Sequence, residues 1–178
     1  MDKLHEFFYT ILDIKKAKYK MAKNIYIAAS FAYADRNKTE ERKASIKKIV
    51  EQIKTHLQAN FYLPQELKIE NAWDYSLEEW GHKVYQEDLG HLIFADTVIF
   101  ISFGKENNAG AVWEVGFIAG LNAASQHSNK NIIMIKMNNE AESLMITNSV
   151  NTIITKEEID KYNWESMPFI KSAVNQLS

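Results

Sequence analysis

The sequence predicts a doubly wound α/β fold, in which a parallel β-sheet carries helices on both faces. Apolar runs at residues 24–30, 97–103 and 131–137 are short and continuous, as buried strands are. The segments between them carry apolar residues at helical spacing. Strands that alternate with helices in this way form parallel sheets, so we expect a flavodoxin- or Rossmann-like arrangement.

The first part of this fold contains two strands and one helix. The strand at residues 24–30 leads into a polar loop over residues 31–38. A helix is expected over residues 39–57, because apolar side chains recur there every three or four positions. Residues 61–63 form a second short strand, which ends before Pro64.

The middle of the chain is predicted to be a helix, a strand and a helix. Ser76 is a typical N-cap residue, so a helix is expected from there to Phe94. The buried strand at residues 97–103 follows it. Residues 110–124 then have the spacing of another helix.

The last part of the chain continues the alternation. The strand at residues 131–137 is followed by a polar loop over residues 138–143 and a short element at residues 144–147. A short strand at residues 152–154 and a closing helix over residues 164–177 complete the expected domain.

Residues 1–22 are a Lys-rich amphipathic stretch that precedes the first strand. We interpret it as an extra helix that packs on the domain or at a subunit contact. A helix on a membrane surface is the alternative, but the stretch has neither Arg nor Trp. The expected organisation is therefore an amphipathic extension over residues 1–22 and one α/β domain over residues 23–178.

Composition excludes several classes of protein. The 178 residues are 46% hydrophobic and 25% charged, which excludes a largely disordered chain. The net charge is −2, with Lys and Arg scattered, so no footprint for DNA or RNA is present. We therefore expect no nucleic-acid polymer as a partner, whereas a single nucleoside or nucleotide remains possible as a ligand.

The chain contains no cysteine, which excludes disulfides, thiolate catalysis and Cys-ligated zinc. Its five His show no paired metal-ligand spacing, so we expect neither a metal nor another cofactor. No apolar run approaches the roughly 20 residues of a membrane span. Acidic and basic residues alternate at the N-terminus, unlike a signal peptide, so a cytoplasmic protein without a membrane partner is expected.

Glu114 is the residue whose position most strongly indicates chemistry. It is expected in the first turn or so of the helix after the strand at residues 97–103, at the sheet edge where ligands bind. A helix start favours the ionised form of a carboxylate. Trp113 and Phe117 flank it, which is not typical of a solvated helix face. The alternative is an acidic residue that only complements the helix dipole.

Asp88 and Asp35 are candidates for a second acid. Asp88 lies near the end of its predicted helix, on the side expected to face the sheet, and Asp35 lies in the loop after the first strand. Two carboxylates, one nucleophilic and one acidic, suit cleavage of a glycosidic bond through an oxocarbenium-like state. A surface charge is the alternative for Asp88, and we interpret Asp35 as a turn residue.

An ordered set of motifs resembles the nucleoside 2-deoxyribosyltransferase family. The set comprises Ile25-Tyr-Ile-Ala-Ala-Ser-Phe31, Tyr62-Leu-Pro-Gln65, Tyr85-Gln-Glu-Asp88-Leu with Ala95-Asp96, and the segment from Gly110 to Gly116. The resemblance extends from Asn24 to about Lys156. Its most specific part is a Glu four residues after a Gly, with an inward Asp upstream.

The resemblance implies a role for each of three residues in bond cleavage. Glu114 looks like the nucleophile that attacks C1′ of the deoxyribose and forms a glycosyl-enzyme intermediate. Tyr26 would hold that carboxylate by a hydrogen bond. Asp88 would contact the base and help to deliver its proton as it leaves.

The resemblance also implies residues that bind substrate. Gln65 would line the base pocket, and Gly110 would lie at the substrate beside the nucleophile. The loop after the first strand, with Ser30, Phe31 and Asp35, would cover the sugar and the base. Members of the family share their sites across a subunit interface, so a homo-oligomer is expected, with a small-molecule substrate as its other partner.

The two positions that read the 5′ end of the substrate depart from the family pattern. Transferases of free nucleosides tend to carry Asp six residues before the nucleophile, and the related deoxynucleoside 5′-monophosphate N-hydrolases carry Ser; this chain has Asn108. Ser143, in a loop expected to reach into a neighbour's site, matches the hydrolases. To bind a phosphate, the first loop offers only two cationic residues, Arg36 and Lys38.

Three functions therefore remain open from the sequence. The first is cleavage of the N-glycosidic bond of 2′-deoxyribonucleosides with transfer of the sugar to another base or to water. The second is the same chemistry on nucleoside 5′-monophosphates, as a hydrolase. The third is a nucleotide-binding or sensory module that keeps the fold without turnover.

Overall fold

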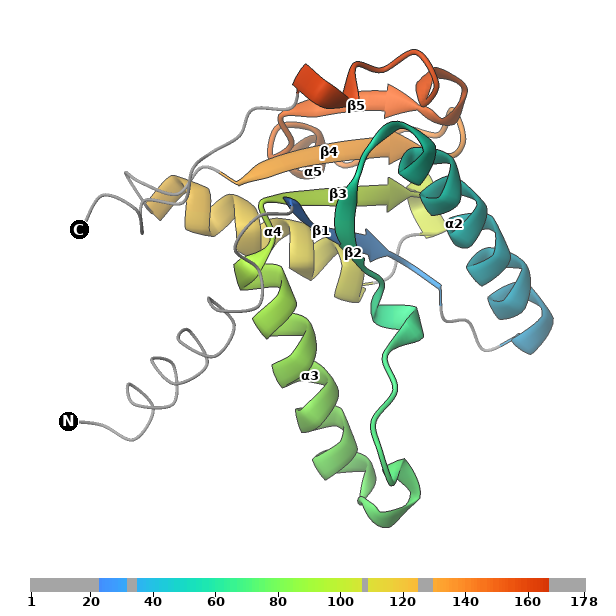
Figure 1. The fold of residues 1–178 in the computed structure, drawn as a ribbon, viewed down its shortest axis with the longest axis vertical. Helices are drawn as coiled ribbons and strands as arrows, with labels where there is room; N and C mark the ends of the chain where they lie inside the picture. The colour runs from blue at the N-terminus through green and yellow to red at the C-terminus, as the bar shows by residue number, and fades with distance from the viewer. Residues whose placement is uncertain (1–22, 32–34, 107–108, 125–129, 167–178) are drawn as a thin grey trace.

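The protein is built on one five-stranded parallel sheet with strand order β2-β1-β3-β4-β5 (Figure 1). The computed structural model describes residues 23–31, 35–106, 109–124 and 130–166. The strands are β1 (Lys23–Ala29), β2 (Ala59–Tyr62), β3 (Thr97–Ser102), β4 (Asn131–Lys136) and β5 (Thr152–Thr155). The doubly wound α/β class predicted from the sequence is confirmed.

Helices cover both faces of this sheet. The described helices are α2 (Arg36–His56), α3 (Leu77–Phe94), α4 (Ala109–Ala124) and the short α5 (Leu144–Thr147). Figure 1 shows α2 and α4 on opposite faces of the strands. Two separate clusters of buried side chains correspond to the two faces.

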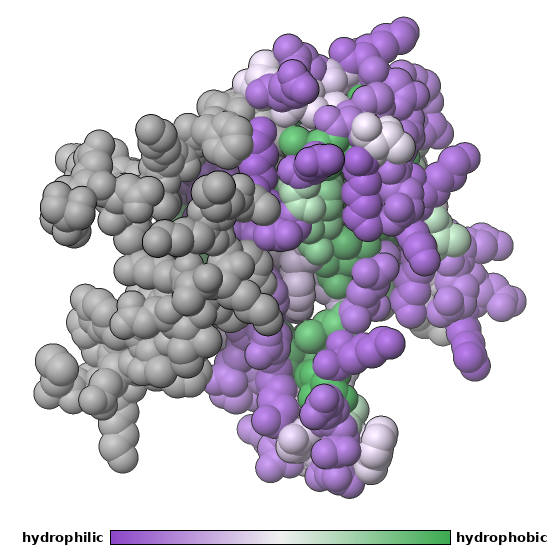
Figure 2. All heavy atoms as spheres, viewed as in Figure 1, coloured by the Kyte–Doolittle hydropathy of each residue, from purple (hydrophilic) through white to green (hydrophobic). Residues whose placement is uncertain are grey.

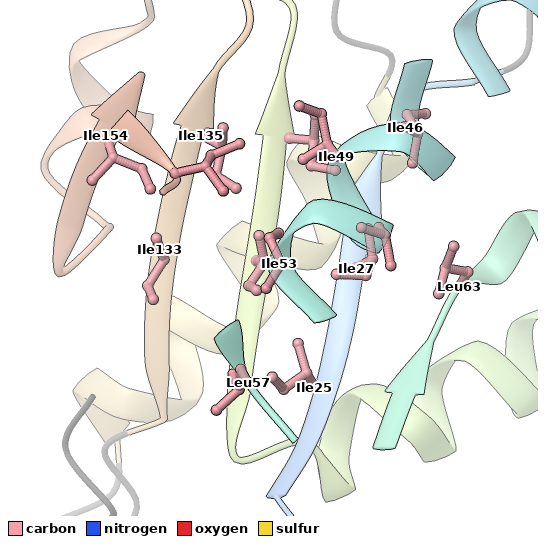
Figure 3. Close-up of a cluster of buried hydrophobic side chains, with 14 of the residues drawn as sticks. Ile25, Ile27, Ile46, Ile49, Ile53, Leu57, Leu63, Ile133, Ile135 and Ile154 are labelled. Carbon is pink, nitrogen blue, oxygen red and sulfur yellow. The ribbon is translucent and has the colours of Figure 1, made fainter. Parts of the chain in front are cut away.

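The larger cluster lies between the sheet and α2. Ile25 and Ile27 of β1 point to this face, and Ile49 and Ile53 of α2 pack on it (Figure 3). Equivalent side chains of β3, β4 and β5 extend the layer as far as Trp164. This continuous apolar layer holds β1 in place.

The other cluster lies between the sheet and the pair α3 and α4. The alternate residues of β1, Tyr26 and Ala28, point to this face. Leu92 of α3 and Val115 of α4 pack against them. Because side chains alternate along β1, Tyr26 lies on the face covered by α3 and α4, the helices that contain Asp88 and Glu114.

The chain reverses its direction across the sheet at β1. From β1 it crosses to β2 on one side and then returns past β1 to β3, so β1 pairs with both strands. In open α/β sheets, ligands bind beyond the carboxyl ends of the strands at such a switch point. The topology therefore predicts a ligand site beyond the carboxyl ends of β1 and β3.

Helix α2 begins at Arg36, three residues before the predicted start. The carboxylate of Asp35 accepts hydrogen bonds from the backbone N–H of Asn37 at 2.8 Å and of Lys38 at 3.4 Å. Asp35 is thus the N-cap of α2, in agreement with its interpretation as a turn residue. The predicted loop over residues 31–38 was too long because this cap was overlooked.

The other boundaries lie close to the predicted ones. Ser76 caps α3 in a capping box with Glu79, as expected. Strand β2 begins at Ala59, two residues before its predicted start. Of the predicted closing helix, Trp164–Ser166 forms a 3₁₀ turn. The remainder of that helix and the extension over residues 1–22 lie outside the described residues.

The surface seen in Figure 2 is mainly hydrophilic, with hydrophobic residues in a narrow strip between polar ones. Across the described part of the chain, no helix has both the length and the apolar character needed to cross a bilayer.

The cap of α2 predicts a stability difference between two substitutions of Asp35. Asp35→Ala removes both capping bonds and is expected to lower the free energy of unfolding by about 1 kcal/mol. Asp35→Asn keeps a capping oxygen and should stay close to the wild type. Urea denaturation of the three proteins measures this. Equal losses in both variants would show that the charge of Asp35, and not its capping bonds, stabilises α2.

Candidate active site

Glu114 and Tyr26 form the first of two tyrosine–carboxylate pairs. Tyr26 is fully buried in β1, and its hydroxyl donates a 2.9 Å hydrogen bond to Oε1 of Glu114. Glu114 itself lies on α4 and is half-buried. Strand β1 therefore fixes one carboxylate oxygen of Glu114 through the hydroxyl of Tyr26.

Asp88 and Tyr62 form the second pair. Tyr62 is the last residue of β2, and its hydroxyl donates a 2.6 Å hydrogen bond to Oδ1 of Asp88 on α3. Asp88 is half-buried and faces the sheet. It is thus held in the same manner as Glu114, by a tyrosine from the neighbouring strand.

The sheet itself brings the two pairs together. Tyr26 and Tyr62 are directly opposite each other in the parallel register of β1 and β2. Their ring centroids are 5.4 Å apart, with an angle of 32° between the rings. Two carboxylates from two helices are thereby held by adjacent tyrosines, and a pair of carboxylates is what glycosidic bond cleavage uses.

Glu114 is not in the first turn of its helix, which contains no acidic residue; it lies in the second. The helix dipole acts mainly within the first turn, so it contributes little here. Burial raises the pKa of Glu114 to about 8, the hydrogen bond from Tyr26 opposes this rise, and the charge of Asp88 adds to it. The expectation that the helix start keeps Glu114 ionised is therefore wrong for the site without substrate.

The other three groups have shifted pKa values as well. Burial raises the pKa of Asp88, the bond from Tyr62 lowers it, and the charge of Glu87 raises it further. Burial and the neighbouring carboxylates raise the pKa of both Tyr26 and Tyr62 above the ordinary value for tyrosine. Both phenols therefore remain protonated donors at neutral pH.

His91 is a neighbour of this site that the sequence reasoning missed. Its ring stacks on Tyr62 with centroids 3.7 Å apart and 14° between the planes. It lies three residues after Asp88, on the same side of α3. That spacing could have identified it. Tyr62 was likewise inside a recognised motif without an assigned role.

Gln65 and Ser30 lie at the carboxyl edge of the sheet. Gln65 is in the 3₁₀ turn that follows β2, and its Oε1 is buried without a hydrogen-bond partner among the described residues. Such an atom is normally satisfied by a ligand or by water. Ser30 is buried directly after the end of β1.

In the described part of the chain, three further predicted residues, Phe31, Gly110 and Ser143, make no hydrogen bond with the two carboxylates. Phe31 packs against the cluster on the α2 face, with the ammonium of Lys43 6.0 Å from its ring centroid. Gly110 is exposed at the start of α4. Ser143 is exposed, and its hydroxyl accepts a hydrogen bond from the backbone of Met145 as the N-cap of α5. Asn108 lies outside the described residues.

An aromatic row borders the carboxylates. The rings of Trp113 and Phe117 stack with centroids 5.2 Å apart, and Tyr85 on α3 is 5.9 Å from Trp113. Tyr85 and Trp113 are both about half exposed. No cluster of three or more His, Asp and Glu side chains suited to a metal ion occurs within the described residues.

Comparison with known proteins identifies the family. A family model described as nucleoside 2-deoxyribosyltransferase matches residues 25–148, which include Tyr26, Tyr62, Asp88 and Glu114. The chain belongs to the nucleoside 2-deoxyribosyltransferase family. A comparison with curated proteins finds no match.

Solved structures confirm the fold of this family member. A 2-deoxyribosyltransferase from Bacillus psychrosaccharolyticus is similar, with 21% identity and a TM-score of 0.60 over 82% of this chain and 96% of that one. A conserved protein from Enterococcus faecalis has 13% identity and a TM-score of 0.54, over 79% of this chain and 99% of that one. At these identities the likeness is one of fold.

The raised pKa of Glu114 predicts how stability depends on pH. Between its ordinary value of 4.5 and about 8, the folded protein holds a proton that the unfolded chain has lost. The free energy of unfolding therefore falls as pH rises through this window. Glu114→Gln has no proton to lose. At pH 8 the free energy of unfolding of Glu114→Gln should exceed that of the wild type by on the order of a few kcal/mol. Near pH 4 the two free energies should be equal.

Thermal or urea unfolding at several pH values measures this difference. Glu70→Gln, an exposed change on the loop before α3, is the matched control and should track the wild type at every pH. A difference between Glu114→Gln and wild type that does not change with pH would contradict the assigned pKa.

Proposed function

We propose that this protein cleaves the N-glycosidic bond of 2′-deoxyribonucleosides and transfers the sugar through a covalent intermediate on Glu114. The observation that carries the proposal is the pair of carboxylates, each held by a tyrosine, at the switch point of the sheet. Membership of the nucleoside 2-deoxyribosyltransferase family supports a nucleoside as the substrate class.

In the first step, a carboxylate oxygen of Glu114 forms a bond to C1′. The bond between C1′ and the base nitrogen breaks, and its electron pair leaves with the base. Because Tyr26 already occupies Oε1, we assign the attack to Oε2. Asp88 donates a proton to the departing base, so that the base leaves neutral. The tyrosine bond fixes the rotamer of the nucleophile before substrate binds.

In the second step, a nitrogen of the acceptor base attacks C1′. The bond from C1′ to Glu114 breaks, its electron pair returns to the carboxylate, and the proton of the acceptor nitrogen passes to Asp88. Water in place of a base gives hydrolysis by the same route. Gln65, whose buried oxygen lacks a partner among the described residues, is suited to accept a hydrogen bond from the base.

Cleavage requires Glu114 ionised, whereas burial favours its protonated form at neutral pH. The specificity constant kcat/KM reports the ionisation of the free enzyme. It should therefore rise with pH until Glu114 has lost its proton. A hydrogen bond to the carboxylate limits this rise in pKa, which gives Tyr26 a second role beside orientation.

We also propose that the active form is a homo-oligomer with a site completed by a neighbouring subunit. Leu144 and Met145, directly after Ser143, are 78% and 82% exposed. Exposed apolar side chains of this size are typical of a surface that another chain covers. Ser143 would then reach the neighbour's substrate from the N-terminus of α5.

A base-exchange assay tests the function directly. The protein is incubated with a free acceptor base and with either a deoxyribonucleoside or its 5′-monophosphate, and free and exchanged bases are separated by chromatography. Exchange with the nucleoside is the expected result. Base release from the monophosphate alone would assign a hydrolase of nucleotides. No release from purine or pyrimidine donors would indicate a binding module.

Replacing Glu114 is expected to remove nearly all turnover. A covalent nucleophile contributes several orders of magnitude in rate, so both Glu114→Ala and Glu114→Gln should lose roughly a thousandfold or more in kcat. Glu70→Gln is the control and should keep wild-type activity. If Glu114→Gln retained more than a tenth of wild-type activity, Glu114 would not be the nucleophile.

Asn108 is expected to permit a 5′-phosphate that Asp would repel. Asn108→Asp places a negative charge against a phosphate in a partly dry site, at a cost of about 3 kcal/mol. The preference for deoxyadenosine over its monophosphate should then rise on the order of a hundredfold. Asn107→Asp adds the same charge one residue away and is the matched control. Equal changes in both variants would show that position 108 does not read the 5′ end.

A further inference from the structure

Tyr62 lies between three groups of the site. Its hydroxyl donates to Asp88 at 2.6 Å, its ring stacks on His91 on α3, and it lies 5.4 Å from Tyr26 in β1. Within the described part of the chain it ends the edge strand of the sheet, which pairs with β1, and Pro64 follows closely after it. The backbone on that side therefore does little to hold the side chain.

We propose that Tyr62 is a positioning residue that holds Asp88 for its work on the leaving base, and that His91 fixes the ring of Tyr62 in place. This inference rests on the proposed function, because Asp88 is taken there as the group that protonates the base. Neither Tyr62 nor His91 is expected to touch the substrate.

The stacking supplies the restraint that the edge strand lacks. The ring centroids of Tyr62 and His91 are 3.7 Å apart and the planes are nearly parallel, at 14°. The ring of Tyr26 packs on Tyr62 as well, with its centroid 5.4 Å away. In contact with two rings, Tyr62 presents its hydroxyl at one position. A fixed donor then selects one rotamer of Asp88, whose other oxygen is directed to the reaction.

The hydrogen bond from Tyr62 to Asp88 also affects the ionisation of the site. The titratable groups around Asp88 come from two strands and two helices. They are Tyr26 on β1, Tyr62 on β2, Glu87 and His91 on α3, and Glu114 on α4. The hydrogen bond from Tyr62 favours ionised Asp88. Ionised Asp88 in turn favours the protonated form of Glu114.

The two tyrosines should therefore act on different carboxylates. Tyr26→Phe removes a donor from Glu114, so the pKa of Glu114 should rise. Tyr62→Phe removes a donor from Asp88, so the pKa of Asp88 should rise. Both changes delete one buried hydroxyl from a packed ring, which makes them matched controls for each other.

Carbon-13 NMR of the substrate-free protein, labelled at the glutamate and aspartate carboxyl carbons, measures the ionisation of Glu114 and Asp88. The signals that disappear in Glu114→Gln and Asp88→Asn assign the two residues. We expect the titration midpoint of Glu114 to move up in Tyr26→Phe, and that of Asp88 to move up in Tyr62→Phe. An Asp88 midpoint that stays in place in Tyr62→Phe, or that moves as much in Tyr26→Phe, would overturn the proposal.

Turnover provides a second readout. Tyr62→Phe should lower kcat for natural deoxyribonucleosides roughly tenfold, which is part of the contribution of a positioned acid, with little change in KM. A donor whose leaving group needs no proton should lose much less. Equal losses on both donors would assign Tyr62 a structural role only.

The role of His91 is tested by keeping or removing its ring. His91→Phe retains the stacking and should behave as the wild type, whereas His91→Ala should reproduce the effects of Tyr62→Phe. If His91→Phe were as impaired as His91→Ala, the imidazole and its pairing with Glu87 would matter, and the stacking argument would be wrong. The NMR titration needs no turnover, so a wild type that cleaves no donor refutes the proposed function and still leaves Tyr62 testable.

Discussion

The register between β1 and β2 is the constraint on which the site depends. It places Tyr26 and Tyr62 opposite each other, and each hydroxyl binds the carboxylate of a different helix. A slip of one residue in either strand would turn its tyrosine to the α2 face, since side chains alternate between faces. The apolar layer under α2, with Ile25 and Ile27 beside Tyr26, prevents such a slip because it would expose these residues.

In this arrangement, stability and function favour different protonation states of Glu114. Burying Glu114 beside Asp88 raises its pKa to about 8, which means that the ionised form needed for attack is disfavoured in the empty site. The phenol of Tyr26 offsets part of this penalty, because it donates a hydrogen bond to the carboxylate of Glu114. A nucleophile held in this way is poorly hydrated and well oriented, both of which favour attack on C1′. Local destabilisation of this kind is common at active sites.

The fold could be predicted from the sequence because its central strands β1, β3 and β4 are buried and read as continuous apolar runs. The start of α2 was missed because the capping role of Asp35 was not recognised, although Asp is a favoured N-cap. Glu114 and Asp88 were selected from their positions in the predicted elements, and Tyr26 came from the resemblance to a family. Tyr62 was given no role, because the register of two parallel strands is not encoded in either strand alone; His91 was missed although its spacing from Asp88 on α3 was visible. The expectation that Glu114 is ionised was wrong for a similar reason, since the burial of Glu114 depends on how α3 and α4 pack together.

The central claim is that Glu114 carries the sugar during the reaction. Rapid acid quenching of the protein with a deoxyribonucleoside donor, followed by mass spectrometry of the intact chain and its peptides, tests it most directly. The predicted result is a mass increase of one deoxyribosyl group on the peptide that contains Glu114. Release of the base with the sugar attached to a different residue, or exchange of bases without any adduct, would contradict the account.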